Sequence, residues 1–207
     1  MGTGGSGAKG IYRLEFNAED GSFSKAELAA EVGSPGFLAL HPNGRVLYAA
    51  CQIERTPSVA AYVIAADASS LSLLNAQPIG DGGATHVSVD ATGKMLLTAQ
   101  YGGGSTAGFP LNEDGSVGER SQLIEHEGGS KVVGNRQDSP HPHWTGFDPA
   151  NRFAFVPDLG LDRVLIYRAD PPTPSWSRTA KASCRPAPDP ATSSSTRMAS
   201  SPMSSTN

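Results

Sequence analysis

The chain has 207 residues, enough for one domain with a hydrophobic core, and its mild formal net charge of -4 identifies no class of partner. Its two cysteines, Cys51 and Cys184, give neither a disulfide framework nor the spacing of a zinc site. The sequence has no basic stripe typical of nucleic-acid binding, no apolar run near the roughly 20 residues of a membrane span, and no hydrophobic signal segment at its start.

The first part of the chain is predicted to form strands joined by turns. Asn17-Ala-Glu-Asp-Gly21 supplies the first turn, and Pro42-Asn-Gly44 supplies the turn of a clear hairpin. Residues 26–31 could equally form one helical turn. Alternating apolar residues predict strands at 11–16, 22–32, 37–40, 45–50, 58–65 and 71–79.

The same hairpin then recurs twice. His41, Asp90 and Asp148 hold equivalent places, 49 and 58 residues apart, each followed by a turn and a second apolar strand. A strand-turn-strand unit that returns roughly every 50 residues is typical of a β-propeller, in which each repeat builds one four-stranded blade. The alternative is a β-sandwich, whose strands do not normally repeat one hairpin at near-constant spacing. We therefore predict an all-β partial propeller of about three blades, whereas closed propellers have about 4 to 8.

The composition changes after residue 170. Of the 37 residues from Pro171 to Asn207, 22 are Ser, Thr or Pro, and none is Gly, Leu, Ile, Val, Phe or Tyr. We expect a partial propeller at 1–170 and a disordered tail at 171–207. A shifted reading frame over 183–207 permits another propeller hairpin, so our hypothesis is that the tail arose by a frameshift. A natural linker is the alternative.

Two histidines stand one residue apart in the segment before the third hairpin. His141 and His143 are flanked by Pro140 and Pro142, which fix φ and limit the movement of the backbone. Imidazole titrates near pH 6.5, so these side chains can exchange protons at neutral pH. A solvated or structural pair of histidines is an equally good interpretation, and a metal-binding pair is a third, because strand positions two apart share a face.

The chain carries five further motifs in order: Ser34–Gly44, Gln100–Ser105, Arg136-Gln137, Pro140–His143 and Pro157–Val164. By their order and spacing they resemble the lactonase family of seven-bladed β-propellers. The resemblance covers about residues 8 to 168 and implies that the chain holds roughly three of seven blades. The family is also similar to fungal carboxy-muconate lactonising enzymes, so the fold alone does not fix the reaction.

The resemblance implies hydrolysis of 6-phospho-glucono-lactone to 6-phosphogluconate, a step of the pentose phosphate pathway, without metal or cofactor. His143 matches the family's active-site histidine and would act as general base. Arg136 and Lys131 are candidate phosphate ligands, although Lys131 fits a solvated loop equally well. The glycines after Tyr101 form either a close approach of backbone to the substrate or a tight turn. The substrate-binding positions that the resemblance implies are His141, Gln137, Arg136 and Tyr101.

The family's other candidate catalytic groups, an Arg and a Glu of the next blade, occur here only in the shifted reading frame. We therefore expect this chain to be inactive or nearly so. A cycloisomerase like the muconate enzymes and a non-catalytic propeller that binds proteins are the alternative functions. We expect a monomer in the cytoplasm whose partner is a small lactone and neither nucleic acid nor membrane, with a lost N-terminal signal left open.

Overall fold

The computed structural model describes residues 7–170 and 175–183 of the chain. This part forms fourteen β-strands and no helix, and so contains no helix that could cross a membrane. The strands are β1 (Gly10–Arg13), β2 (Glu27–Glu31), β3 (Leu38–Leu40), β4 (Val46–Ile53), β5 (Thr56–Ile64), β6 (Leu71–Pro78), β7 (His86–Val89), β8 (Met95–Gln100), β9 (Ser105–Pro110), β10 (Gln122–Glu125), β11 (Gly146–Phe147), β12 (Phe153–Asp158), β13 (Arg163–Asp170) and β14 (Ser175–Ser183).

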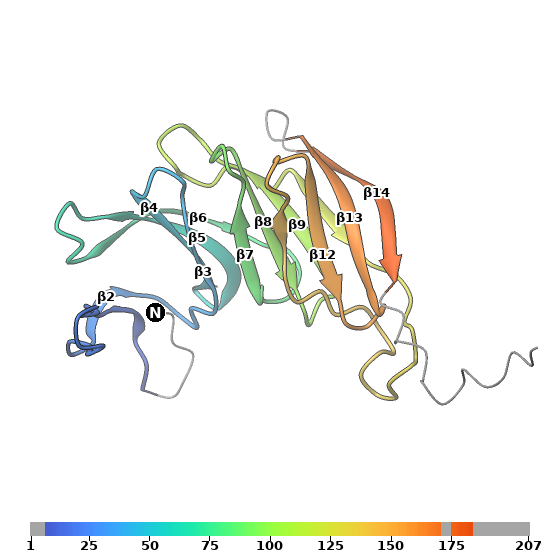
Figure 1. Cartoon of the computed structure of the whole chain (residues 1–207), viewed down its shortest axis with the longest axis horizontal. Helices are drawn as coiled ribbons and strands as arrows, with labels where there is room; N and C mark the ends of the chain where they lie inside the picture. Colours follow the sequence, from blue (N-terminus) through green and yellow to red (C-terminus); the bar gives the residue numbers. More distant parts are fainter. Residues whose placement is uncertain (1–6, 171–174, 184–207) are drawn as a thin grey trace, which may run out of the picture.

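The strands form three four-stranded antiparallel sheets and one pair. β3 to β6 make the first blade, β7 to β10 the second and β11 to β14 the third, each in chain order, while β1 pairs with β2. The blades follow one another along an arc (Figure 1), and β7 contacts both β3 and β11, so the first strands of the blades lie side by side. The prediction of a partial propeller with three blades is confirmed, and residues 27–31 form a strand rather than a helical turn.

The expectation that the chain lacks structure from residue 171 onward is wrong for Ser175–Ser183. These residues form β14, which pairs with β13 as the outer strand of the third blade. No proline or glycine lies between Pro174 and Pro186, so the backbone can remain extended and hydrogen-bond to the edge of β13. Residues 184–207, on which most of the frameshift hypothesis depends, lie outside the described residues.

The core consists of apolar layers between neighbouring sheets. Along β8, Leu96 packs toward the first blade, whereas Met95 and Leu97 pack toward the third. Along β4, Tyr48 packs toward the second blade and Ala49 toward β1 and β2. Successive side chains of a strand point to opposite faces, so a sheet covered on both faces needs apolar residues at nearly every position.

The recurring turns explain the repeat in the sequence. The Oδ1 atom of Asp90 accepts hydrogen bonds from the backbone N–H groups of Lys94 (2.7 Å) and Met95 (2.6 Å), and Asp148 holds the equivalent turn of the third blade. Three residues after His41, Asp90 and Asp148, the backbone is left-handed in each turn. The residues there are Gly44 (φ 70°), Gly93 (φ 69°) and Asn151 (φ 57°), types that tolerate this conformation.

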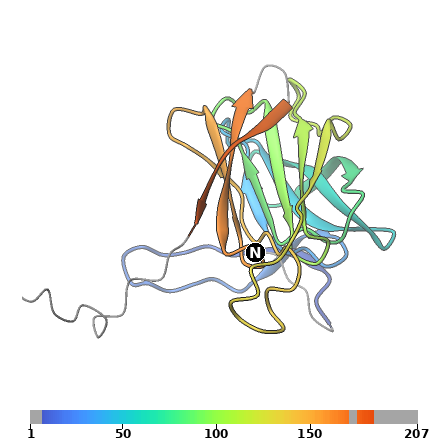
Figure 2. The same cartoon turned by 90° about the vertical axis from the view of Figure 1, so that its right-hand side faces the viewer.

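The opposite ends of the first strands carry the candidate site. The connection between β10 and β11 runs from residue 126 to 145 and projects from that end of the sheets (Figure 2). The β8–β9 turn lies beside it, because the backbone carbonyl of Tyr101 is hydrogen-bonded to the His141 ring. Loops of the second and third blades therefore meet at one rim of the arc.

Candidate functional site

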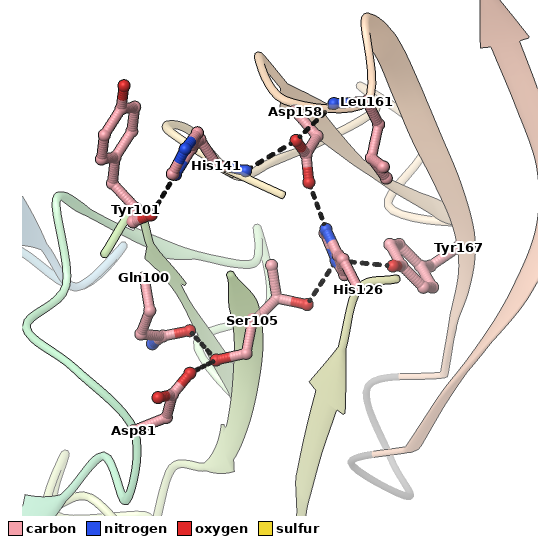
Figure 3. A network of polar contacts seen from close by, with 10 residues as sticks. Asp81, Gln100, Tyr101, Ser105, His126, His141, Asp158, Leu161 and Tyr167 are labelled. Atoms are coloured by element: carbon pink, nitrogen blue, oxygen red, sulfur yellow. Dashed lines mark hydrogen bonds and ion pairs between the residues drawn. The ribbon is translucent and has the colours of Figure 1, made fainter. Parts of the chain in front are cut away.

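Tyr101 brings the two histidines of the His-Pro segment together. Its ring stacks on His141, with centroids 4.5 Å apart and planes 16° from parallel, and meets His143 edge-on at 5.7 Å and 82°. The Nδ1 atom of His141 lies 2.9 Å from the carbonyl oxygen of Tyr101 (Figure 3). A carbonyl only accepts, so this nitrogen carries the proton and Nε2 is the basic atom of the neutral His141 ring.

Backbone hydrogen bonds attach this segment to the end of β12. The His143 N–H donates to the carbonyl of Pro157 (3.2 Å), and the Leu159 N–H donates to the carbonyl of His141 (3.1 Å). The His141 N–H donates to the Oδ1 atom of Asp158 at 2.8 Å. The histidine segment is thus fixed in direction although it belongs to a long loop.

His143 and Arg136 present their side chains to solvent beside Tyr101. Both residues are exposed, and neither ring nitrogen of His143 has a hydrogen-bond partner among the residues that the structure describes. The Nη2 atom of Arg136 lies 3.4 Å from the Tyr101 hydroxyl. Lys131 is exposed in the same loop. The rim therefore combines the accessible imidazole of His143 with the guanidinium of Arg136, and the side chain of Tyr101 contacts both.

Gln137 holds the loop rather than facing solvent. Gln137 is only 4% exposed, and both ends of its side-chain amide make hydrogen bonds. The Oε1 atom accepts from the Val133 N–H at 2.7 Å, and Nε2 donates to the carbonyl of Leu159 at 2.8 Å. Both polar atoms of this buried amide therefore bind the backbone of the loop and of the β12–β13 turn.

The glycines after Tyr101 form a tight turn between β8 and β9. The Gly104 N–H donates to the carbonyl of Gln100 at 2.8 Å, and Gly104 has φ of 77°. A side chain at Gly103 would collide with the carboxylate of Asp81. That carboxylate accepts a hydrogen bond from the buried hydroxyl of Ser105 (Figure 3). The glycine run thus allows Asp81 to approach the turn.

A row of rings across the three blades was not predicted from the sequence. Phe37 and His86 have ring centroids 4.0 Å apart, and His86 and Trp144 are 5.4 Å apart. Burial, and secondly the nearby His143, lowers the pKa of His86 to about 4, so its ring is neutral at pH 7. The signal was present in the sequence, because each ring stands four residues before His41, Asp90 or Asp148.

A second residue that sequence reasoning missed is His126, just after β10. Its Nδ1 atom lies 2.6 Å from the Oδ2 atom of Asp158, and its Nε2 atom lies 3.0 Å from the Tyr167 hydroxyl. Burial opposes ionisation of Asp158, but hydrogen bonds from His126, His141 and Leu161 lower the pKa of its carboxyl. No local motif marks His126, which is 32 residues from Asp158 in the chain.

No group of three or more His, Cys, Asp or Glu side chains in the described ranges 7–170 and 175–183 could hold a metal ion. His141 uses Nδ1 toward the backbone, and the Nδ1 of His126 faces a carboxylate. The chemistry that this geometry offers is proton transfer at imidazole nitrogens, with Arg136 as a nearby cation.

The comparisons with known proteins agree with this architecture. The family model described as Lactonase, 7-bladed beta-propeller matches residues 1–190. A 6-phosphogluconolactonase of Bacillus subtilis is 36% identical over 162 residues, which are 78% of this chain and 46% of that protein. The chain thus spans about half the length of the curated relatives it matches.

Solved structures show the same fold. One from Bacteroides uniformis, provisionally described as a 6-phosphogluconolactonase, gives a TM-score of 0.78 at 28% identity and covers 89% of this chain and 53% of its own. A periplasmic gluconolactonase of Pseudomonas aeruginosa gives a TM-score of 0.73 at 25% identity, covering 84% of this chain and 53% of its own.

Proposed function

The chain belongs to the lactonase family of seven-bladed β-propellers, and on that premise we propose that it supplies the histidine half of an active site that hydrolyses a sugar lactone. The substrate proposed is 6-phospho-glucono-lactone and the product 6-phosphogluconate. The observation that carries the proposal is the arrangement of His141 and His143 around Tyr101, with Arg136 at the tyrosine hydroxyl. Relatives named for this activity match 78% of the chain.

His143 acts as the general base in this proposal. Its exposed ring takes a proton from a water molecule while the water oxygen bonds to the lactone carbonyl carbon. The tetrahedral intermediate then expels the ring oxygen, which receives the proton back from the imidazolium. The C–O bond of the lactone ring is broken, and the product carries a new carboxylic acid, which ionises. A base of this kind contributes roughly 10²- to 10⁴-fold.

The other residues bind and orient the substrate. Arg136 offers planar, charge-assisted donors to the phosphate. Its Nη2 atom lies 3.4 Å from the Tyr101 hydroxyl, at the same rim as the two histidines. His141, stacked on Tyr101, presents Nε2 to a substrate hydroxyl. Gln137 acts indirectly in this proposal, because its amide holds the loop that carries Arg136.

The test requires the blades that this chain does not contain. A hybrid is made in which residues 8–170 replace the matching segment of the Bacillus subtilis relative. Hydrolysis of 6-phospho-glucono-lactone is followed in a pH-stat for the hybrid and for the 207-residue chain. We expect the hybrid to exceed the spontaneous rate, and the chain alone to add little to it, since the resemblance puts an arginine and a glutamate of the site in the following blade.

The hybrid also separates the alternative functions. Faster turnover of a carboxymuconolactone than of the sugar lactone would favour a cycloisomerase. A hybrid that unfolds in one cooperative transition but hydrolyses neither lactone above the spontaneous rate would contradict the proposed function and favour a binding protein.

A further inference from the structure

We propose that Asp158 is a positioning residue for the histidine segment, and that His126 fixes Asp158 from the neighbouring blade. Asp158 is the last residue of β12, and its carboxylate has 0% side-chain exposure. Only the expected effect of Asp158 on hydrolysis rests on the proposed function. The structural content of the proposal, that one buried carboxylate sets the position of His141 and His143, stands on the contacts of Asp158 alone.

The two oxygens of Asp158 join three separate parts of the chain. Oδ1 accepts the N–H groups of His141 at 2.8 Å and Leu161 at 3.0 Å, and Oδ2 accepts from Nδ1 of His126 at 2.6 Å (Figure 3). The carboxylate thus ties the histidine segment to the β12–β13 turn and to the second blade. Hydrogen bonds to a buried charge are among the stronger ones, and a donor left unpaired in such a place is costly.

His126 has a defined orientation because both of its ring nitrogens are engaged. A carboxylate only accepts, so Nδ1 of His126 donates to Asp158. In the neutral ring, Nε2 is then the acceptor, 3.0 Å from the Tyr167 hydroxyl and 3.5 Å from Thr106 Oγ1. Tyr167 lies on β13 and Thr106 on β9, so the ring is held between the third and second blades.

Because of its two prolines, the histidine segment has few backbone hydrogen bonds besides the one to Asp158. Pro140 and Pro142 have no N–H group, so His141 and His143 own the only backbone donors between residues 140 and 143. The His141 donor goes to Asp158 and the His143 donor to the carbonyl of Pro157. Loss of the carboxylate removes one of these two bonds and leaves the buried His126 ring without its acceptor. A misplacement of about 1 Å at a reacting group can cost roughly 10²-fold in rate.

Asp148 provides a matched control at the other end of the same hairpin. Its Oδ1 atom accepts the N–H groups of Arg152 and Phe153, each at 2.6 Å, so it also caps a turn of the third blade. Replacing Asp148 weakens the blade without touching the histidine segment. An effect seen with Asp158 variants and not with Asp148 variants is therefore not a general loss of stability.

The experiment uses the full 207-residue chain labelled with ¹⁵N and ¹³C. Amide hydrogen exchange of His141 and His143, and the ring Cε1–H signals of both residues, are compared for Asp158→Ala, Asp158→Asn and Asp148→Ala. We expect Asp158→Ala to accelerate exchange at both amides about tenfold over Asp148→Ala and to shift both ring signals. Asp158→Asn keeps an oxygen acceptor for the His141 N–H and should restore most of the protection. Equal exchange in the two alanine variants would overturn the proposal.

The catalytic consequence is measured in the hybrid with the Bacillus subtilis relative. There Asp158→Ala should lower kcat more than it changes KM, because it displaces the His143 base, and Asp158→Asn, which keeps the acceptor for the His141 N–H, should retain most of kcat. Inactivity of the unmodified hybrid would count against the proposed function, while the exchange result in the 207-residue chain would still decide the positioning role.

Discussion

His126 and Asp158 are joined across the boundary between the second and third blades by a hydrogen bond of 2.6 Å between Nδ1 and Oδ2. Their side chains are 1% and 0% exposed. Leu97, Val156 and Leu165 form part of the apolar layer between the same two blades. A polar pair in such a layer specifies one relative position of the blades, because sliding them would leave the buried Oδ2 atom of Asp158 without its donor.

The recurring turn should depend on its aspartate. Asp90 is fully buried and accepts hydrogen bonds from Lys94, Met95 and Asn151. We expect Asp90→Ala to lower the free energy of unfolding by about 2 to 4 kcal/mol, since several donors lose a charged acceptor. Urea denaturation measures the change. The control is Asp114→Ala, because Asp114 caps an exposed turn at Ser116; a similar loss for both variants would contradict the role given to Asp90.

His86 should make stability depend on pH in a narrow range. Its pKa is lowered to about 4 in the folded state, whereas an unfolded histidine titrates near 6.5. The unfolded chain binds the proton first, so this contribution is complete above pH 6.5 and is lost as the pH falls toward 4. The pKa values of the Asp90 and Asp158 carboxyls are also lowered, so these groups change the stability only at pH values below the range in which His86 acts.

The measurement is the unfolding free energy at pH 7 and pH 4.5 for the wild type and His86→Gln. The wild type should lose more stability between the two values than the variant does. Identical losses would mean that His86 is not held in its neutral form.

Arg136 should distinguish phosphorylated from unphosphorylated lactones. In the hybrid, Arg136→Ala should raise KM for 6-phospho-glucono-lactone about tenfold, the scale of one charge-assisted contact, and leave glucono-lactone unchanged. Arg152→Ala is the control, because Arg152 is an exposed arginine whose partner is Asp148 at the opposite rim. Equal effects on both lactones would remove Arg136 from the phosphate site.

The blades could be predicted from the sequence because each of their recurring turns is determined by residues close together in the chain. The turns at His41, Asp90 and Asp148 need an acceptor and a residue with positive φ three positions later, and both leave a repeating pattern. β14 was missed because composition averaged over a long segment hides nine residues without proline or glycine that an existing strand edge can pair with. Pairing with a neighbouring strand is a tertiary effect that composition does not contain.

The site was predicted in part. The family resemblance implied His141, His143, Tyr101 and Arg136 as site residues, and the structure brings their side chains together. The sequence could not mark His126, since its partner Asp158 belongs to another blade. Gln137 was expected at the substrate because the family resemblance implied it, whereas in the structure both ends of its amide hold the loop.

The role of His143 as the base is tested by comparing His143→Ala with His41→Ala in the hybrid. His41 lies at the opposite rim, where its ring bonds to the carbonyl of Gly93. We expect His143→Ala to lower kcat roughly 10²- to 10⁴-fold at unchanged folding and His41→Ala to leave kcat nearly as it was. Hydrolysis that continues at the full rate without the His143 imidazole would contradict the proposal that this residue takes the proton from water.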